Sequence, residues 1–533
     1  MKSQERYCPG KLQRPGPTDD KQPSEITTSP SVRLLFDRRW RGRVGFTFSL
    51  GPFLMERPMP SGSFPRLRLR SSDTVDLAAA DSAHFGSGAA PSRWSLINHN
   101  EWGSTLIVFL IFLLSIVIYL PFLALPLLPD DYLQVTLARK YGPVSAWGAL
   151  AEDPLYRSRA TSLILTYWTD TVFGFSRLAF GISSILLHAV NALLVYALGA
   201  ARRIGWRLSA LTAVFFVLQE RYHEAVIWYS ALPELLVFCF SLLTLLFWVR
   251  WLQSAEPSAL ALVGALACFC LALLSKESAV SVILLMLLFV VGESSPRRRP
   301  LRALLPFGLL VAAYVVLVFS GQDRNHHFWD GTFSLQAGAL KALIGSAIRA
   351  LWIWGIVGLI VLLVFASRKR RGVTALALGW ILITLLPYSF LTYMPRVPSR
   401  HHYLAAVGCS LILALAATIL QERVGRRRLI GLCALLIGVH HISYMWAVKY
   451  PQFRERSEPI EALIRYMRRE QRRPVVIRCF PYSFGEARRA VVIRLGEPEA
   501  NLILDTASGN SDLPSFCPED RPKYRTEAHG LSQ

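Results

Sequence analysis

The sequence LIVFLIFLLSIVIYLPFLALPLLPDDYLQVTLARKYG, residues 106–142, changes character at Pro129. Its first part is a nearly uninterrupted apolar run, and a helix needs about 20 such residues to cross a bilayer. Two adjacent carboxylates, Asp130 and Asp131, follow directly, and a half-polar stretch continues to Gly142. The segment therefore predicts a membrane-spanning helix with two acids at its end.

The rest of the chain repeats this alternation of apolar windows and short polar loops. Of its 533 residues, 53% are hydrophobic and 18% are charged, whereas about 25% are charged in ordinary soluble domains. We therefore predict an all-α polytopic membrane protein with about 11 transmembrane helices. The predicted spans are 104–125, 178–200, 208–222, 231–252, 259–274, 279–292, 303–320, 339–366, 373–391, 403–420 and 429–447.

The loops between these spans alternate in charge, which predicts their orientation. The basic loops are 201–207, 296–302, 368–372 and 421–428, and basic loops stay in the cytoplasm. The acids gather in the other loops. We therefore expect a multi-pass protein of the cell (inner) membrane with a cytoplasmic N-terminus and an extracytoplasmic C-terminus. The net charge of +22 comes largely from the inner loops and the N-terminal region, which argues against a nucleic-acid partner.

The sequence divides into three regions. Residues 1–100 are rich in Arg, Pro, Ser and Gly and predict a disordered basic region, with a mis-assigned start codon as the alternative. We expect residues 101–447 to form the transmembrane domain. Residues 448–533 predict a small extracytoplasmic α/β domain with a flexible tail, because EPIEALIRYMRRE (458–470) has helical periodicity and RPVVIRCFPY (473–482) resembles a buried strand. Whether Cys479 and Cys517 form a disulfide stays open.

Asp130 and Asp131 have two interpretations. Carboxylates at the start of a helix cap its backbone N–H groups and favour its dipole. The functional interpretation rests on three facts: there are two acids, a long loop with amphipathic helical pieces follows them to about residue 177, and polar residues return to the same face later. We expect the helical pieces of this loop to lie in the membrane interface.

The polar residues that return to the outer face are candidates for binding, because ionisable groups at membrane depth are costly. Lys276 and Glu277 lie between two spans, where a neutralising pair is the alternative interpretation. For His401 and its neighbour His402, the alternative interpretation is that they are interfacial residues that bind no ligand. The candidate binding residues are Arg157, His223, Glu224, Lys276, Glu277, Arg396, Arg400 and His401.

Four stretches together resemble a known superfamily. They are LPDDYLQV (128–135), the loop from DPLYRSRATS (153–162) into the second span, YHEAVIWYSALPELL (222–236) and LALLSKESAV (271–280). Their order resembles the GT-C glycosyltransferases, and specifically bacterial relatives of dolichyl-phosphate-mannose protein mannosyltransferases and of transmembrane tetratricopeptide O-mannosyltransferases, without the repeats. Ser158 stands where that pattern has proline after Tyr156 and Arg157.

The resemblance implies a GT-C fold and a hexosyltransferase that moves a sugar from a polyprenyl-phosphate donor to a protein or glycan acceptor on the extracytoplasmic face. It places the catalytic acid in the first loop, at Asp130 in preference to Asp131, as the general base. Lys276, Arg396, Arg400 or Arg157 would hold the charge of the leaving lipid phosphate. His223 with Glu224 would contact sugar or acceptor. A divalent cation is a possible cofactor, and its ligands stay unknown.

Two other classes of function remain open. A transporter or flippase of lipid-linked sugars would need ionisable residues in mid-span and broken helices in matching halves. A polymerase or ligase of the O-antigen type would rely on Arg and His in a late outer loop, as RVPSRHHYL (396–404) provides. The sequence leaves the sugar and the acceptor undefined.

Overall fold

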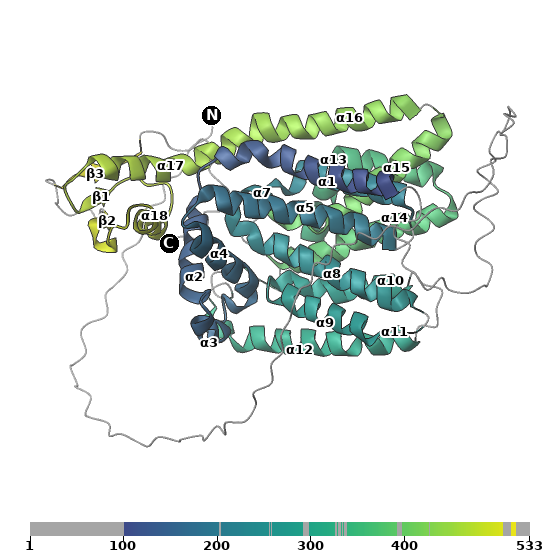
Figure 1. Ribbon diagram of the computed structural model, residues 1–533, viewed down its shortest axis with the longest axis horizontal. Coiled ribbons are helices and arrows are strands. Elements are labelled where there is room, and N and C mark those ends of the chain that lie inside the picture. The colour runs from purple at the N-terminus through teal and green to yellow at the C-terminus, as the bar shows by residue number, and fades with distance from the viewer. Residues whose placement is uncertain are drawn as a thin grey trace, which may run out of the picture. The chain divides into compact units, whose positions relative to one another are not determined.

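The computed structural model describes residues 101–201, 204–254, 256, 258–291, 298–325, 328, 332, 334, 338–391, 397–425, 427–504 and 513–518. The predicted region 1–100 and the end of the predicted tail lie outside these residues. A bundle of mostly apolar helices makes up most of the described chain (Figure 1). Its helices are α1 (Glu101–Tyr119), α5 (Arg177–Ala201), α6 (Trp206–Leu218), α8 (Leu232–Gln253), α9 (Ala259–Leu273), α10 (Val282–Val291), α11 (Arg298–Ala303), α12 (Leu305–Ser320), α13 (Ala339–Phe365), α14 (Arg368–Leu385), α15 (Ala406–Val424) and α16 (Arg427–Tyr444).

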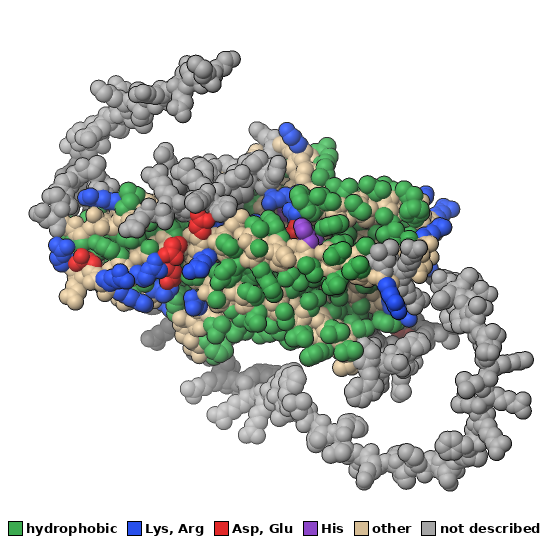
Figure 2. Space-filling view, turned by 90° about the horizontal axis from the view of Figure 1, so that it is seen from above, with side chains coloured by type: hydrophobic (Ala, Val, Ile, Leu, Met, Phe, Trp, Pro, Cys, Tyr) green, Lys and Arg blue, Asp and Glu red, His purple; other side chains and the backbone are tan. Residues whose placement is uncertain are grey.

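Each predicted span corresponds to an apolar helix in the described part of the chain. Eight of these helices are long and apolar enough to cross a membrane, and three shorter ones cover Trp206–Leu218, Ala259–Leu273 and Glu277–Val291. The all-α membrane architecture is confirmed, whereas the exact number of spans stays a prediction. Leu106, Phe109, Val316 and Leu363 are among the exposed apolar side chains. Figure 2 shows such side chains across the bundle, as a surface that faces lipid requires.

The long loop after α1 is helical, as its sequence predicts. It contains α2 (Pro129–Tyr141), α3 (Trp147–Glu152) and α4 (Ala160–Phe173), which gather at one end of the bundle (Figure 1). Proline at the first position of α2 suits a helix start, because no N–H is needed there. The next loop contributes α7 (His223–Ile227) at the same end.

The last helix of the bundle continues into the C-terminal region. One π-helical turn, Met445–Lys449, joins α16 to α17 (Tyr450–Arg469). Beyond it, a parallel sheet of order β2-β1-β3 packs with α17 and α18 (Phe484–Leu495). The strands are β1 (Val475–Ile477), β2 (Leu502–Leu504) and β3 (Ser515–Phe516). We call the described residues from 450 to 518 the tail domain.

The sequence accounts for the main elements of the tail domain. Val475, Val476 and Ile477 are all buried, as the central strand of a small sheet requires. Ser483 and Glu486 form a capping box at the start of α18, and Gly496 ends the helix at a φ of 69°. The predicted strand and the predicted helix before it are therefore confirmed. Cys479 and Cys517 are both exposed.

Candidate active site between the first loop and the tail domain

Asp131 is a buried carboxylate that joins two loops. Its Oδ2 accepts a hydrogen bond from the Leu128 backbone N at 2.8 Å, which completes the cap of α2. Its Oδ1 accepts from the backbone N and the Oγ of Ser230, at 2.7 and 3.0 Å. Burial raises the pKa of Asp131 to about 7, and the donors on Leu128 and Ser230 oppose that rise. The capping interpretation therefore holds for Asp131.

Asp130 lies one residue earlier and has a different environment. Its side chain is half-buried and is hydrogen-bonded to Glu486 of the tail domain. Glu486 is 7% exposed, and its Oε2 accepts from the Ser483 backbone N at 2.7 Å. Burial, followed by the contact with Asp130, raises the pKa of Glu486 to about 7. The two neighbouring aspartates thus differ in role. Asp131 joins two loops, whereas Asp130 forms a carboxyl pair with Glu486.

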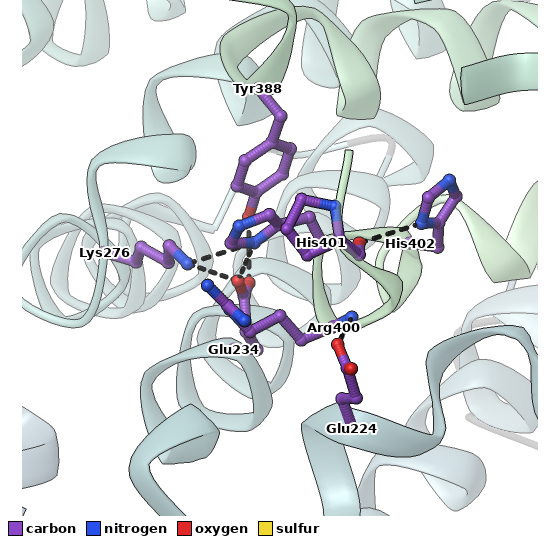
Figure 3. Close-up of polar contacts among 8 residues, drawn as sticks. Glu224, Glu234, Lys276, Tyr388, Arg400, His401 and His402 are labelled. Carbon is purple, nitrogen blue, oxygen red and sulfur yellow. Dashed lines mark hydrogen bonds and ion pairs between the residues drawn. The ribbon is translucent and has the colours of Figure 1, made fainter. Parts of the chain in front are cut away.

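A buried polar network lies deeper between the helices (Figure 3). Its centre is Glu234, at the start of α8. The Nζ of Lys276 and the Nδ1 of His401 both bond to Oε1 of Glu234, and the Tyr388 hydroxyl donates to Oε2 at 2.8 Å. The rings of Tyr388 and His401 stack with centroids 4.3 Å apart. We call these four residues the Glu234 network.

The charges within the Glu234 network neutralise each other. Burial lowers the pKa of His401 to about 3, so its imidazole is neutral near pH 7. Lys276 and Glu234 are then one cation and one anion, and the hydrogen-bonded partner of Lys276 is Glu234 and not its neighbour Glu277. Lys276 is only 9% exposed. Such an arrangement neutralises buried charge and leaves little of the ammonium for a phosphate.

A third group surrounds Trp228. The guanidinium carbons of Arg400 and Arg456 lie 4.8 and 4.9 Å from its ring, so two cations flank one buried indole. The Arg400 backbone N donates to Oε2 of Glu224 at 3.4 Å (Figure 3). Burial opposes ionisation of Glu224, but His223, Arg400, Ser399 and Arg456 outweigh it, and the pKa of Glu224 falls to about 2.

The remaining predicted residues occupy nearby positions. His223 is buried, and its Nδ1 donates to the Glu220 carbonyl at 2.6 Å; burial lowers the pKa of His223 to about 3. Arg157 donates to the Leu317 carbonyl. Ser158 donates to Oε1 of Glu277 at 2.9 Å. The residue that departs from the family pattern thus ties the first loop to the turn that carries Lys276. Arg396 lies outside the described residues.

The structure therefore brings the predicted residues into three groups. Lys276 joins His401, Glu224 joins Arg400, and Asp130 with Asp131 stands at the tail domain. Sequence reasoning missed the roles of Glu234, Tyr388, Arg456 and Glu486 as partners of these residues. Glu234 was visible as one of the acids of the outer loops. No local signal marked the other three, because each acts only through a contact distant in sequence.

Metal binding has no ready-made site in the described part of the chain. No group of three or more His, Cys, Asp or Glu side chains there is arranged to hold a metal ion. Both oxygens of Asp131 already accept hydrogen bonds from the protein. A divalent cation stays a prediction from the family resemblance.

Residues 163–321 match the family model of dolichyl-phosphate-mannose-protein mannosyltransferases. The match covers under a third of the chain and lies within the helical bundle. The matched segment includes Glu224 and Lys276 and leaves Asp130 outside it. This match over residues 163–321 and the apolar helices together support glycosyl transfer at a membrane. No curated protein matches the chain.

Solved structures of two transferases resemble this one at low sequence identity. An oligosaccharyltransferase of Archaeoglobus fulgidus, tethered to an acceptor peptide, is 13% identical at a TM-score of 0.47, over 74% of this chain. The mycobacterial arabinofuranosyltransferase AftD is 14% identical at a TM-score of 0.40, over 71% of this chain. The chain spans 63% of the archaeal protein and 30% of the mycobacterial one.

Proposed function

We propose that the protein transfers a sugar from a polyprenyl-phosphate donor to a protein or glycan acceptor on the extracytoplasmic face, with Asp130 as general base. The acceptor oxygen forms a bond to the anomeric carbon as the bond from that carbon to the phosphate oxygen breaks. The hydroxyl proton passes to Asp130, and the electron pair leaves with the lipid phosphate. A positioned carboxylate contributes roughly 10²–10⁴-fold to such a step.

The contrast between Asp130 and Asp131 carries this proposal. Asp131 accepts three hydrogen bonds from Leu128 and Ser230, so its oxygens are committed to holding two loops together. Asp130 is half-buried and belongs to the same rigid helix start. A base must reach the acceptor while its helix stays fixed, and this division of roles supports Asp130 as that base.

Arg400 is the better-supported candidate for the leaving phosphate. Lys276 is buried and paired with Glu234, whereas Arg400 is half-buried and flanks Trp228 beside a second cation, Arg456. A guanidinium matches phosphate oxygens in geometry and keeps its charge at all relevant pH values. Glu224, whose Oε2 accepts from the Arg400 backbone N, would fix the backbone at Arg400 and contact sugar or acceptor.

The decisive experiment is a transfer assay with the purified protein in lipid. We would offer radiolabelled polyprenyl-phosphate sugars and membrane-extract acceptors to wild type, Asp130→Asn and Asp131→Asn. We expect Asp130→Asn to lower transfer by about 10²-fold or more while the thermal unfolding temperature stays close to that of wild type. Asp131→Asn should lose stability together with activity.

Two outcomes would overturn the assignment. Transfer by Asp130→Asn at the wild-type rate would remove Asp130 as the base. Donor binding without any transfer, unchanged in both variants, would favour a lipid-linked sugar transporter or flippase over an enzyme.

A further inference from the structure

We infer that Glu486 of the tail domain is a positioning residue for Asp130, so that the base of the reaction is held by a carboxylic acid supplied from the far end of the chain. This inference rests on the proposed function of Asp130. It assigns the tail domain a part in the chemistry, beyond any role in acceptor binding.

The packing of α18 on α2 fixes this arrangement. The two helices lie against one another, and a second contact supports the first, because Arg494 of α18 donates to the Tyr132 hydroxyl at 3.2 Å. Arg494 is itself held by Glu461 of α17 at 2.7 Å. Glu486 and Arg494 of α18 thus both contact the first turn of α2, which carries Asp130.

Glu486 can adopt only a narrow range of positions. It is the third residue of α18. Its Oε2 accepts a hydrogen bond from the Ser483 backbone N, and the backbone N of Glu486 donates to the Ser483 Oγ. The capping box therefore fixes one carboxyl oxygen, and the carboxyl is buried and hydrogen-bonded to Asp130. Side chains held in this way by their own partners are what a precise site requires.

Two carboxyl groups hydrogen-bond to each other only if they share a proton, because two carboxylates at that distance repel. Burial and the contact with Asp130 raise the pKa of Glu486, so Glu486 carries the proton and donates it in the hydrogen bond to Asp130. Asp131 is the other carboxyl beside Asp130 on α2, and Tyr482 of the tail domain is a further titratable group near both Asp130 and Glu486. A donated hydrogen bond orients the base and leaves its second oxygen for the acceptor hydroxyl.

The test compares Glu486→Gln with wild type across pH. Glutamine can still accept from Ser483 and donate to Asp130, but it does not ionise. We expect the wild-type kcat to fall as pH rises through about 7, where Glu486 loses its proton, and we expect Glu486→Gln to keep a rate close to wild type without this fall. Glu486→Ala should lose about tenfold or more in kcat at every pH, with little change in the KM for the donor.

The matched control is Glu499→Gln. It removes a carboxylate from the same domain, but Glu499 pairs with Arg488 at 3.1 Å and is largely exposed. Its pH profile and kcat should be those of wild type. Identical pH profiles for wild type and Glu486→Gln would overturn the inference while the proposed function of Asp130 stood.

An infrared titration tests whether Glu486 is the protonated member of the pair, and it needs no activity measurement. In wild-type protein in lipid, the carbonyl band of a protonated carboxyl should disappear near pH 7, and the difference spectrum against Glu486→Gln should contain it. Asp130→Asn should shift this band, since it replaces the partner. Asp131 contributes equally to wild type and Glu486→Gln and so cancels. A difference spectrum without such a band would overturn the inference, whether or not the protein transfers sugar.

Discussion

The Glu234 network and the Asp130–Glu486 pair are both polar clusters built from distant segments, but they treat charge differently. In the network, a lysine, a histidine and a tyrosine surround one carboxylate, and every member is buried. In the pair, two acids face each other, and Asp130 remains half-buried.

This difference separates structural charge from reactive charge. A buried cluster whose charges neutralise each other stabilises one packing of its helices and has little capacity left for a ligand. Two like groups in contact store an unfavourable interaction that only a proton relieves, and strained or perturbed groups gather at functional sites. We therefore interpret the Glu234 network as structural and Asp130 as catalytic.

Breaking the Glu234 network should have the largest effect on stability. Glu234→Ala leaves the Lys276 ammonium buried without its anion, and the loss of one partner of a buried pair costs about 3–5 kcal/mol. We expect a large fall in the thermal unfolding temperature of the detergent-solubilised protein.

The paired change Glu234→Gln with Lys276→Met sharpens this test. It removes both charges, so the double variant should be more stable than Glu234→Ala and than Lys276→Met with Glu234 left in place. A double variant less stable than both would show that the network does more than neutralise charge.

The second prediction separates the two aspartates by stability. Asp131→Ala leaves three donors on Leu128 and Ser230 without their acceptor, and we expect it to cost about 2 kcal/mol. Asp130→Ala removes one member of an acid pair and should leave the unfolding temperature nearly unchanged. Equal losses in both variants, measured by the same thermal scan, would contradict the division of roles.

The third prediction concerns Glu224 and pH. Its folded pKa of about 2 lies below the usual glutamate value of 4.5, so its ionised form stabilises the fold above pH 4.5, and this contribution is lost as pH falls from 4.5 toward 2. Wild type should lose up to about 1 kcal/mol per pH unit relative to Glu224→Gln in this range. Parallel pH–stability curves for the two proteins would contradict the pairing of Glu224 with Arg400.

Much of the fold could be predicted from local pattern. Apolar windows located the helices because the length of a span is set by the bilayer, and the pieces of the first loop and the strand Val475–Ile477 followed from periodicity. Asp130 and Asp131 stood out because they interrupt an apolar run.

The partners of these residues could not be predicted in the same way. Lys276 has an acid beside it in sequence, yet its hydrogen-bonded partner is Glu234, which packing brings from another helix. Glu486 looks like an ordinary capping-box residue, and only the docking of α18 on α2 gives it Asp130 as a partner. Local composition determines which helix forms, whereas the facing side chain depends on how helices pack.

The contact between α2 and α18 also orders events during synthesis. The ribosome makes Asp130 before most of the bundle, and Glu486 emerges only after the last long helix has been completed. A chain released early would insert its helices and carry the aspartate without its acid partner. If Glu486 positions Asp130 as proposed, the protein would reach its full transfer rate only once translation is nearly finished.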